Sequence, residues 1–210
     1  MSSTAPSLRF TGATVYPTPS HAVPGELAIR DGVITHAGPA APGDDGHGRV
    51  IDARGTSIVP LLDGNALRAR PAGERGAYDL VPGNPATFAV VRGRVGESQM
   101  RNMLVVRPAD LLAVVVDGEI LVRDGEPTPA AGAPDPDAWV GVWTDRGRAL
   151  DQHLLPGGRY TETRGGRVDA YTGAWWTRGD RIVYRDDSGF WAFGVRYDGV
   201  IYHAGIVLRR

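Results

Sequence analysis

The sequence predicts an all-β protein of two domains, and three observations support this class. Short runs that alternate apolar and polar residues recur along the chain between Gly- and Asp-rich turns, as in half-buried strands. The Pro-rich stretch EPTPAAGAPDPD divides the 210 residues and predicts a linker at 128–137. All five Trp follow this stretch, so we expect the two domains to have different cores.

The composition excludes several kinds of chemistry. The chain has no Cys, which rules out disulfides, thiolate zinc sites and a Cys nucleophile. All 23 basic residues are Arg, so neither a Schiff-base Lys nor a P-loop Lys is available. A net charge of −1 gives no field that attracts nucleic acid. No apolar run approaches the roughly 18 residues that a membrane helix needs.

These features favour a cytoplasmic protein without nucleic-acid or membrane partners. The first ten residues, MSSTAPSLRF, lack the basic segment and apolar core of a secretory signal. The bias towards Arg, Ala, Gly and Asp is typical of a GC-rich bacterial genome.

The first domain, residues 1–127, contains two hairpin signals and a further strand. The segments ELAIRDGVITHAG (26–38) and DLLAVVVDGEILVRDG (110–125) each place an Asp-Gly pair between two alternating runs. The segment ATFAVVRGRV (86–95) is another apolar run rich in β-branched residues.

This first domain resembles the two ends of the amidohydrolase superfamily. Residues 8–67 follow the opening of that family, including RVIDARGTSIVPLLDG (49–64), and residues 80–127 follow its C-terminal strands. The resemblance implies a composite β-sandwich in which both ends join. In the family a (β/α)₈ barrel of roughly 250 residues lies between them. Here only residues 68–79 remain, and we expect a loop there.

The same resemblance implies that metal-dependent hydrolysis is lost. The family places a His-x-His pair just after the residue corresponding to Asp63, where this chain has Asn65-Ala66-Leu67. An amide is a poor zinc ligand and Leu is none. The five His show neither His-x-His nor HExxH spacing. We therefore expect no metal and no cofactor, and instead a structural module that forms a homodimer through its exposed apolar flank. The Arg-rich loop 68–79 offers an anion site as an alternative.

The second domain, residues 138–210, predicts a meander that closes into a barrel. Strand-like runs of about six to nine residues alternate with regularly spaced turns, and closure removes the exposed edges of such a sheet. The segments WVGVW, LLPGGRYTETRGG, AYTGAWW, IVYRDDSGFWAFG and DGVIYHAGIVL resemble a family of small bacterial proteins of unknown function. The resemblance implies a streptavidin-like or calycin-like antiparallel β-barrel and gives no reaction.

The segment RYTETR provides the main candidate site. Tyr160, Glu162 and Arg164 share one face of a strand because side chains alternate with period two. If this face points inward, it forms the polar wall of a pocket in a small barrel. If it points outward, the three residues form solvated surface pairs that contribute little. Both orientations are compatible with the sequence.

Other candidates lie on neighbouring strands of this domain. We expect Tyr171, Trp175, Tyr184 and Asp187 to contact a ligand. Core packing is the alternative for Trp175, and turn formation is the alternative for Asp187. His203, in IYHAG, becomes a general acid or base if it faces Glu162, because His titrates near neutral pH. Otherwise it is a hydrogen-bonded structural residue.

The sequence therefore favours a protein that binds a small molecule in the C-terminal barrel. A cofactor-independent acid/base catalyst of cyclisation, isomerisation or elimination in bacterial specialised metabolism would use the same cavity, with Glu162 and His203 as catalytic residues. The alternative is a non-catalytic assembly or partner-binding module.

Overall fold

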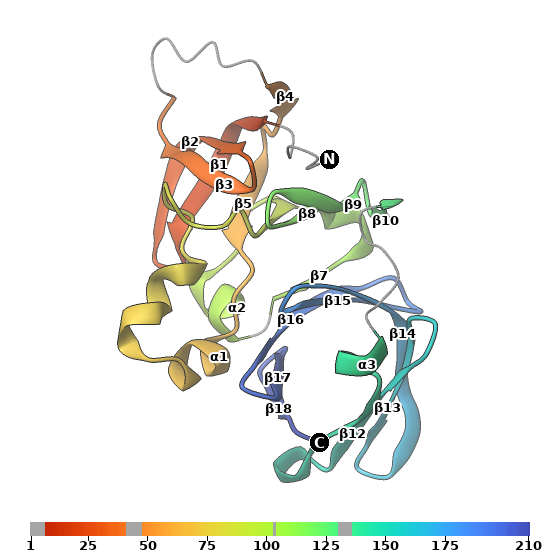
Figure 1. The fold of residues 1–210 in the computed structure, drawn as a ribbon. Helices are drawn as coiled ribbons and strands as arrows, with labels where there is room; N and C mark the ends of the chain where they lie inside the picture. Colours follow the sequence, from red (N-terminus) through yellow and green to blue (C-terminus); the bar gives the residue numbers. More distant parts are fainter. Residues whose placement is uncertain (1–6, 41–47, 103, 130–135) are drawn as a thin grey trace. The chain divides into compact units, whose positions relative to one another are not determined.

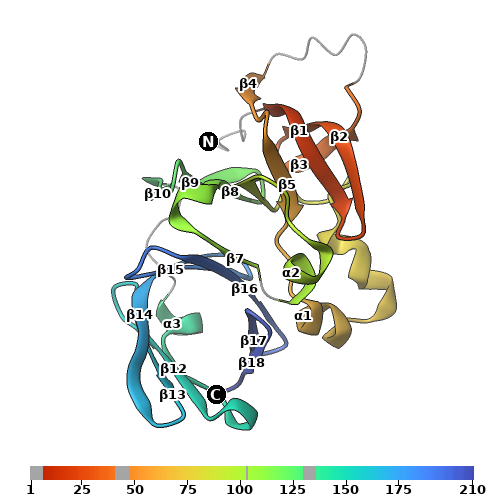
Figure 2. The ribbon, with the colours of Figure 1, turned by 180° about the vertical axis from the view of Figure 1, so that it is seen from behind.

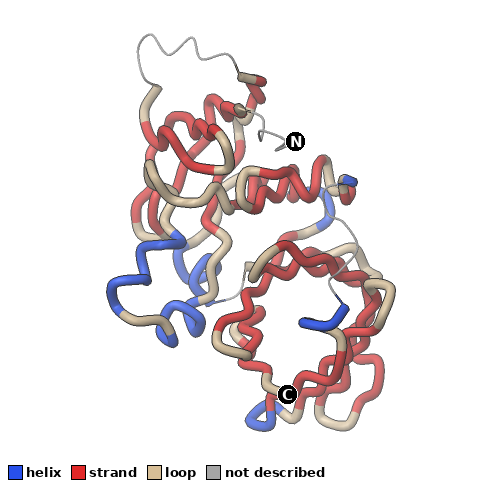
Figure 3. The backbone as a smooth tube through the Cα atoms, viewed as in Figure 1, coloured by secondary structure: helices blue, strands red, loops and turns tan. Residues whose placement is uncertain are grey.

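The computed structural model describes residues 7–40, 48–102, 104–129 and 136–210. Strands dominate the chain (Figure 3), which confirms the predicted all-β class. The described residues form two compact units: those within 1–61, 71–100 and 109–130 make up the first, and those within 62–70, 101–108 and 131–210 make up the second. Segments 62–70 and 101–108 thus lie in the second unit, although the sequence placed them within the first domain. Most of the expected linker at 128–137 lies outside the described residues.

The first unit is built on a nine-stranded sheet with the order β10-β9-β8-β6-β5-β1-β2-β3, and β4 pairs with β1. Strands from both ends of this part of the sequence meet at the centre, where β5 pairs in parallel with β1 and antiparallel with β6. The strands are β1 (Leu8–Thr18), β2 (His21–Arg30), β3 (Val33–Gly38), β4 (Arg49–Asp52), β5 (Thr56–Pro60), β6 (Phe88–Arg92), β8 (Leu111–Val116), β9 (Glu119–Arg123) and β10 (Glu126–Pro127).

Two tight hairpins and one hydrophobic core shape this sheet. The two predicted Asp-Gly hairpins are present, and Asp31, Gly32, Asp117 and Gly118 all have positive φ, as a two-residue type I′ turn requires. Residues from β1, β2, β3, β5, β6 and β8 share a single buried cluster. The sheet therefore curls over one core, and it is continuous rather than split into two separate layers.

Short helices replace the loop that the sequence predicts at 68–79. These are α1 (Gly64–Ala69) in the second unit and the 3-10 helix η1 (Ala72–Tyr78) in the first. Asp63 begins α1 because its side chain accepts hydrogen bonds from the backbone N–H groups of Asn65 and Ala66. The other short helices are α2 (Glu97–Asn102), η2 (Pro108–Asp110), α3 (Pro136–Trp139) and η4 (Arg146–Arg148).

The second unit is an antiparallel meander in which β11 to β18 follow one another in sequence order. Figures 1 and 2 show these strands arranged around a ring. Paired backbone hydrogen bonds between Thr144 and Arg209 join the last strand to the first, so the predicted barrel is nearly closed. The strands are β11 (Gly141–Asp145), β12 (Leu150–Leu155), β13 (Arg159–Arg164), β14 (Arg167–Arg178), β15 (Arg181–Asp186), β16 (Trp191–Tyr197), β17 (Val200–His203) and β18 (Ile206–Leu208).

Aromatic residues fill one part of the barrel interior. Trp139 of α3 is buried with Trp143, Trp175 and Tyr184 in one cluster. The Trp139 carbonyl accepts a 2.7 Å hydrogen bond from the Trp143 indole, which fixes α3 against β11. A two-residue strand, β7 (Val105–Val106), pairs with β16 from outside the meander. Within the described residues no helix has both the length and the apolar character that crossing a membrane requires.

Candidate functional site

A cavity of about 420 Å³ opens at one end of the barrel. In an antiparallel meander alternate turns lie at the same end, which here groups the turns at 146–149, 165–166, 187–190 and 204–205. We call this end the barrel mouth and the space beneath it the barrel-mouth cavity. Its lining includes Tyr160, Glu162, Arg164, Tyr184 and His203.

The polar wall of the cavity comes from β13. Tyr160 and Glu162 are buried, whereas Thr161 and Thr163 on the alternating positions are more exposed. All three members of the Tyr160, Glu162 and Arg164 row line the cavity. The row therefore lies on the inner face of the barrel wall, with Tyr160 and Glu162 buried and Arg164 exposed at the mouth, because a strand in the wall has one face inside and one outside.

Glu162 is a buried carboxylate with one charged partner. Its side chain is 2% exposed, and its Oε1 accepts a hydrogen bond from Nε of Arg164. Arg164 is 43% exposed, and its guanidinium lies 4.6 Å from the centre of the Tyr171 ring. The second oxygen, Oε2, has no hydrogen-bond partner in the part of the chain that the structure describes.

An aromatic row lies beside this carboxylate. The rings of Tyr160 and Tyr184 meet edge to face with centroids 5.3 Å apart, and the centroid of the His203 ring lies 4.2 Å from that of Tyr184. The Tyr184 hydroxyl donates a 2.9 Å hydrogen bond to Oε1 of the buried Gln152. Burial raises the pKa of both Tyr160 and Tyr184, so both hydroxyls keep their protons at neutral pH.

His203 is a neutral base in this environment. Its Nδ1 lies 3.3 Å from the carbonyl oxygen of Phe193, and a carbonyl can only accept, so Nδ1 carries the proton. Burial lowers the pKa of His203 to about 4. The other nitrogen, Nε2, consequently offers a lone pair and has no partner within the described part of the chain.

Two of the sequence candidates lie elsewhere. Trp175 is fully buried in the aromatic cluster, where its indole N–H donates to the Arg159 carbonyl at 2.8 Å. Asp187 is about half exposed and forms a two-pronged ion pair with Arg159 at 2.8 and 2.9 Å. That pair lowers the pKa of Asp187 to about 2. Neither side chain lines the cavity, so we leave both out of the site proposed below.

Several residues in or next to the cavity were not predicted from the sequence. Gln152 lies opposite Glu162 on β12 and shares its inward face with Leu150 and Leu154, so strand alternation could have found it. Val105 and Arg148 line the cavity itself. Val105 belongs to a segment far away in the sequence, and no local pattern predicts its pairing with β16.

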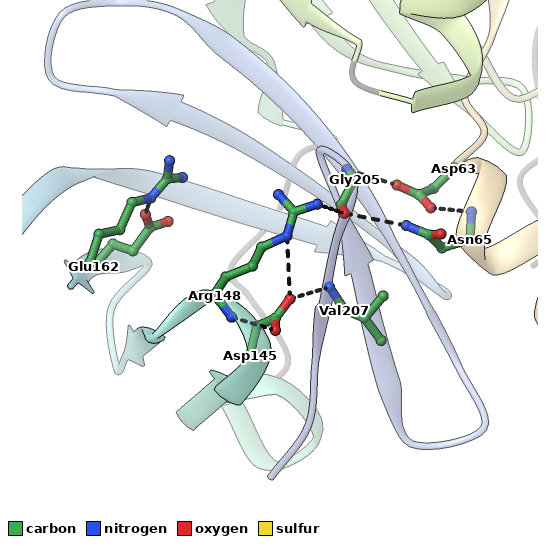
Figure 4. A network of polar contacts seen from close by, with 8 residues as sticks. Asp63, Asn65, Asp145, Arg148, Glu162, Gly205 and Val207 are labelled. Atoms are coloured by element: carbon green, nitrogen blue, oxygen red, sulfur yellow. Dashed lines mark hydrogen bonds and ion pairs between the residues drawn. The ribbon is translucent and has the colours of Figure 1, made fainter.

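Asp63 and Asn65, which lie in the segment that resembles the opening of the amidohydrolase superfamily, bind one turn of the barrel mouth. Figure 4 shows Asp63 and Asn65 together on one side of Gly205, a turn residue between β17 and β18, and Arg148 on the other side. Asp63 Oδ2 accepts from the Gly205 N–H and Asn65 Nδ2 donates to the Gly205 carbonyl, both at 3.3 Å. Arg148 donates to the same carbonyl at 2.9 Å. Gly205 has φ +76°, and an added Cβ would lie 2.8 Å from the Asn102 carbonyl oxygen.

These contacts do not fit the metal that the hydrolase resemblance would require. Asp63 uses both oxygens on backbone N–H groups, and Asn65 turns its amide nitrogen towards the barrel. Among the residues with described positions, no group of three or more His, Asp or Glu side chains is placed to hold a metal ion. The fold and the site instead define a small antiparallel β-barrel protein with a polar, aromatic-lined cavity at one end.

Comparisons with known proteins assign the barrel to a family. Residues 136–210 match the model described as Agrobacterium tumefaciens protein Atu4866. The solution structure of that protein is 41% identical over 34% of this chain and 92% of its own, with a TM-score of 0.32. By sequence, the chain belongs to the Atu4866 family through its residues 136–210.

Two further comparisons add little. A crystal structure of beta-aspartyl dipeptidase from Fervidobacterium islandicum AW-1 is 16% identical over 30% of this chain and 16% of its own, with a TM-score of 0.24. A search of curated proteins found no match. The likeness of the first unit to the composite domain of amidohydrolases and the streptavidin-like character of the barrel therefore stay predictions.

Proposed function

We propose that this protein binds a small molecule in the barrel-mouth cavity. The observation that carries the proposal is a cavity of about 420 Å³, open at the barrel mouth, with hydrogen-bonding groups of Glu162, Tyr160 and His203 at its wall. Ligand pockets in proteins typically occupy about 300 to 1,000 Å³ and combine apolar walls with a few polar groups. A barrel that served only for assembly would have no need of such a space, and side chains would fill it.

Acid/base catalysis without a cofactor is a second candidate. The neutral His203 has a free lone pair on Nε2, and Glu162 lines the same cavity. A substrate bound between them would present a proton to His203, while Glu162 would stabilise developing positive charge. Cyclisation, isomerisation and elimination need such proton transfers.

The experiment is a thermal-melting screen of the full chain against a chemically mixed fragment library. We expect some fragments to raise the melting temperature of the wild type. These shifts should disappear in Ala192→Phe, which adds a ring to the cavity lining, and diminish in Glu162→Gln or His203→Ala. The matched control is His153→Ala, because His153 lies at a position of β12 that alternates with the inward-facing Gln152.

Two outcomes would contradict the proposal. One is a library without any stabilising fragment, and the other is a set of shifts that persists unchanged in Ala192→Phe. Three expectations from the sequence accompany the proposal: a cytoplasmic location, a role in bacterial specialised metabolism, and a homodimer formed through the first unit.

A further inference from the structure

We infer that the ligand of the barrel-mouth cavity is a small planar cation rich in N–H groups, such as an amidinium, a guanidinium or a protonated amino-heterocycle. This inference rests on the proposed function and names the chemical class that the cavity would take. Three features carry it: the acceptors left free at the cavity wall, the guanidinium that already lies against Glu162, and the aromatic side chains around both.

The free polar groups of the wall are mainly acceptors. Within the described residues, Oε2 of Glu162 and Nε2 of His203 have no partner. Both are acceptors, because the Glu162 carboxylate pairs with the Arg164 guanidinium and the proton of His203 lies on Nδ1. The hydroxyl of Tyr160 is also unpartnered there and can donate or accept. A ligand that satisfies this wall must bring at least two donors, which a planar N–H group with several protons does.

The guanidinium of Arg164 shows which chemistry fits. It donates to Glu162 and stacks on Tyr171, so one planar cation of this chain already occupies the outer part of the site. Its side chain is 43% exposed and has a flexible stem, so it can turn towards solvent when another cation replaces it at Glu162. A ligand cation would then take over the ion pair with Glu162.

The charges around Glu162 favour a cationic ligand over an anionic one. A cation that replaces Arg164 leaves the buried Glu162 carboxylate paired throughout. An anion that drew Arg164 away would leave that carboxylate buried without a partner, which is strongly unfavourable. An anion that bound the remaining N–H groups of Arg164 would lie close to the negative charge of Glu162. Arg148, the other Arg at the cavity, already donates to the Gly205 carbonyl and pairs with Asp145. The cavity is therefore poorly equipped to compensate an added negative charge.

The walls suit a flat ligand. Tyr160 and Tyr184 present ring edges and faces inside the cavity. At the mouth, Tyr171 and Phe190 are unusually exposed for large apolar side chains, at 47% and 40%. Aromatic faces attract cations and stack on planar groups. One aromatic ring with a charged substituent fits the available volume.

The test compares three probes of nearly the same shape: benzamidine, which is cationic, benzamide, which is neutral, and benzoate, which is anionic. Each is titrated into the full chain at neutral pH by protein-observed NMR. We expect benzamidine to bind about tenfold more tightly than benzamide, which corresponds to one charge-assisted hydrogen bond, and benzoate to bind most weakly. This ranking needs no variant, so it holds even if a substitution prevents folding.

Variants of Glu162 and Arg164 test which side chains determine the binding of the cation. Glu162→Gln should remove most of the advantage of benzamidine and leave benzamide nearly unchanged. Arg164→Gln should strengthen benzamidine binding several-fold, because it removes the competing guanidinium. Arg167→Gln is the matched control, since Arg167 is an exposed Arg opposite Arg164 in the β13–β14 register, and it should change nothing.

The possible failures are distinguishable. Benzoate binding as tightly as benzamidine, or weaker benzamidine binding in Arg164→Gln, would overturn the cationic class. If library fragments bind in the cavity and benzamidine does not, the ligand class is wrong while the proposed function stands. If no fragment binds in a way that Ala192→Phe abolishes, the proposed function fails as well.

Discussion

Replacing Asp63 with Ala should destabilise the second unit, and the size of the effect follows from its contacts. Oδ1 accepts from the backbone N–H of Asn65 at 2.8 Å and of Ala66 at 3.3 Å, and Oδ2 accepts from Gly205 N–H at 3.3 Å. Loss of an N-cap costs about 1 kcal/mol. Leaving the Gly205 N–H without its partner adds about 1 kcal/mol.

Burial limits the total. Desolvation raises the pKa of Asp63 despite its three backbone partners. Burying the charged carboxylate therefore costs free energy that offsets part of its hydrogen bonds. We therefore expect a loss of about 2 kcal/mol for Asp63→Ala. Asp63→Asn should lose about 1 kcal/mol, because Asn keeps the N-cap acceptor and turns an N–H₂ group towards the Gly205 N–H.

The assay is urea unfolding of the full chain followed by Trp fluorescence. All five Trp lie in the second unit, so this signal reports that unit selectively. The control is Asp52→Ala, since Asp52 is exposed in the first unit and pairs with the exposed Arg54; it should leave the Trp transition unchanged. An Asp63→Ala midpoint equal to that of the wild type would refute the structural role assigned to this carboxylate.

Three further predictions concern the barrel interior. Because burial lowers the pKa of His203 to about 4, the free energy of unfolding has its full value above about pH 6.5 and falls by up to about 3 kcal/mol as the pH drops towards 4. His203→Phe should flatten this part of the stability profile, and an unchanged profile would contradict the burial of His203. Gly173→Ala should destabilise the barrel by about 3 kcal/mol or more, because an added Cβ would lie 2.2 Å from a backbone oxygen, whereas Gly147→Ala, with 3.4 Å to its nearest neighbour, should unfold like the wild type. The double variant Gln152→Leu with Tyr184→Phe should cost about 1 to 2 kcal/mol less than the sum of its single variants, since each single variant orphans the other partner; additive losses in urea unfolding would argue against this hydrogen bond.

Local patterns of the sequence predicted much of the fold. The Asp-Gly turns at 31–32 and 117–118 are hairpin turns with positive φ, because few other dipeptides tolerate that backbone. The alternation in RYTETR identified residues that share a face. It left open whether that face points inward, since strand period fixes sides and not their direction.

Contacts between segments far apart in the chain could not be predicted from local sequence patterns. Segments 62–70 and 101–108 pack within the second unit, although their neighbours along the chain form the sheet of the first. The short helix α1 has too few residues for a periodic signal, and Asp63 was interpreted only as the residue that precedes the His-x-His position of the amidohydrolase resemblance. Whether Trp175 packs in the core or lines the cavity depends on how far along the barrel it lies, which no spacing rule gives.

The most direct test of the central claim is a crystallographic fragment soak of the full chain. We expect fragment density inside the barrel mouth, within hydrogen-bonding distance of Glu162 and in contact with the rings of Tyr184 and His203. A barrel whose own side chains fill that space, or fragments bound only on the outer wall, would contradict it.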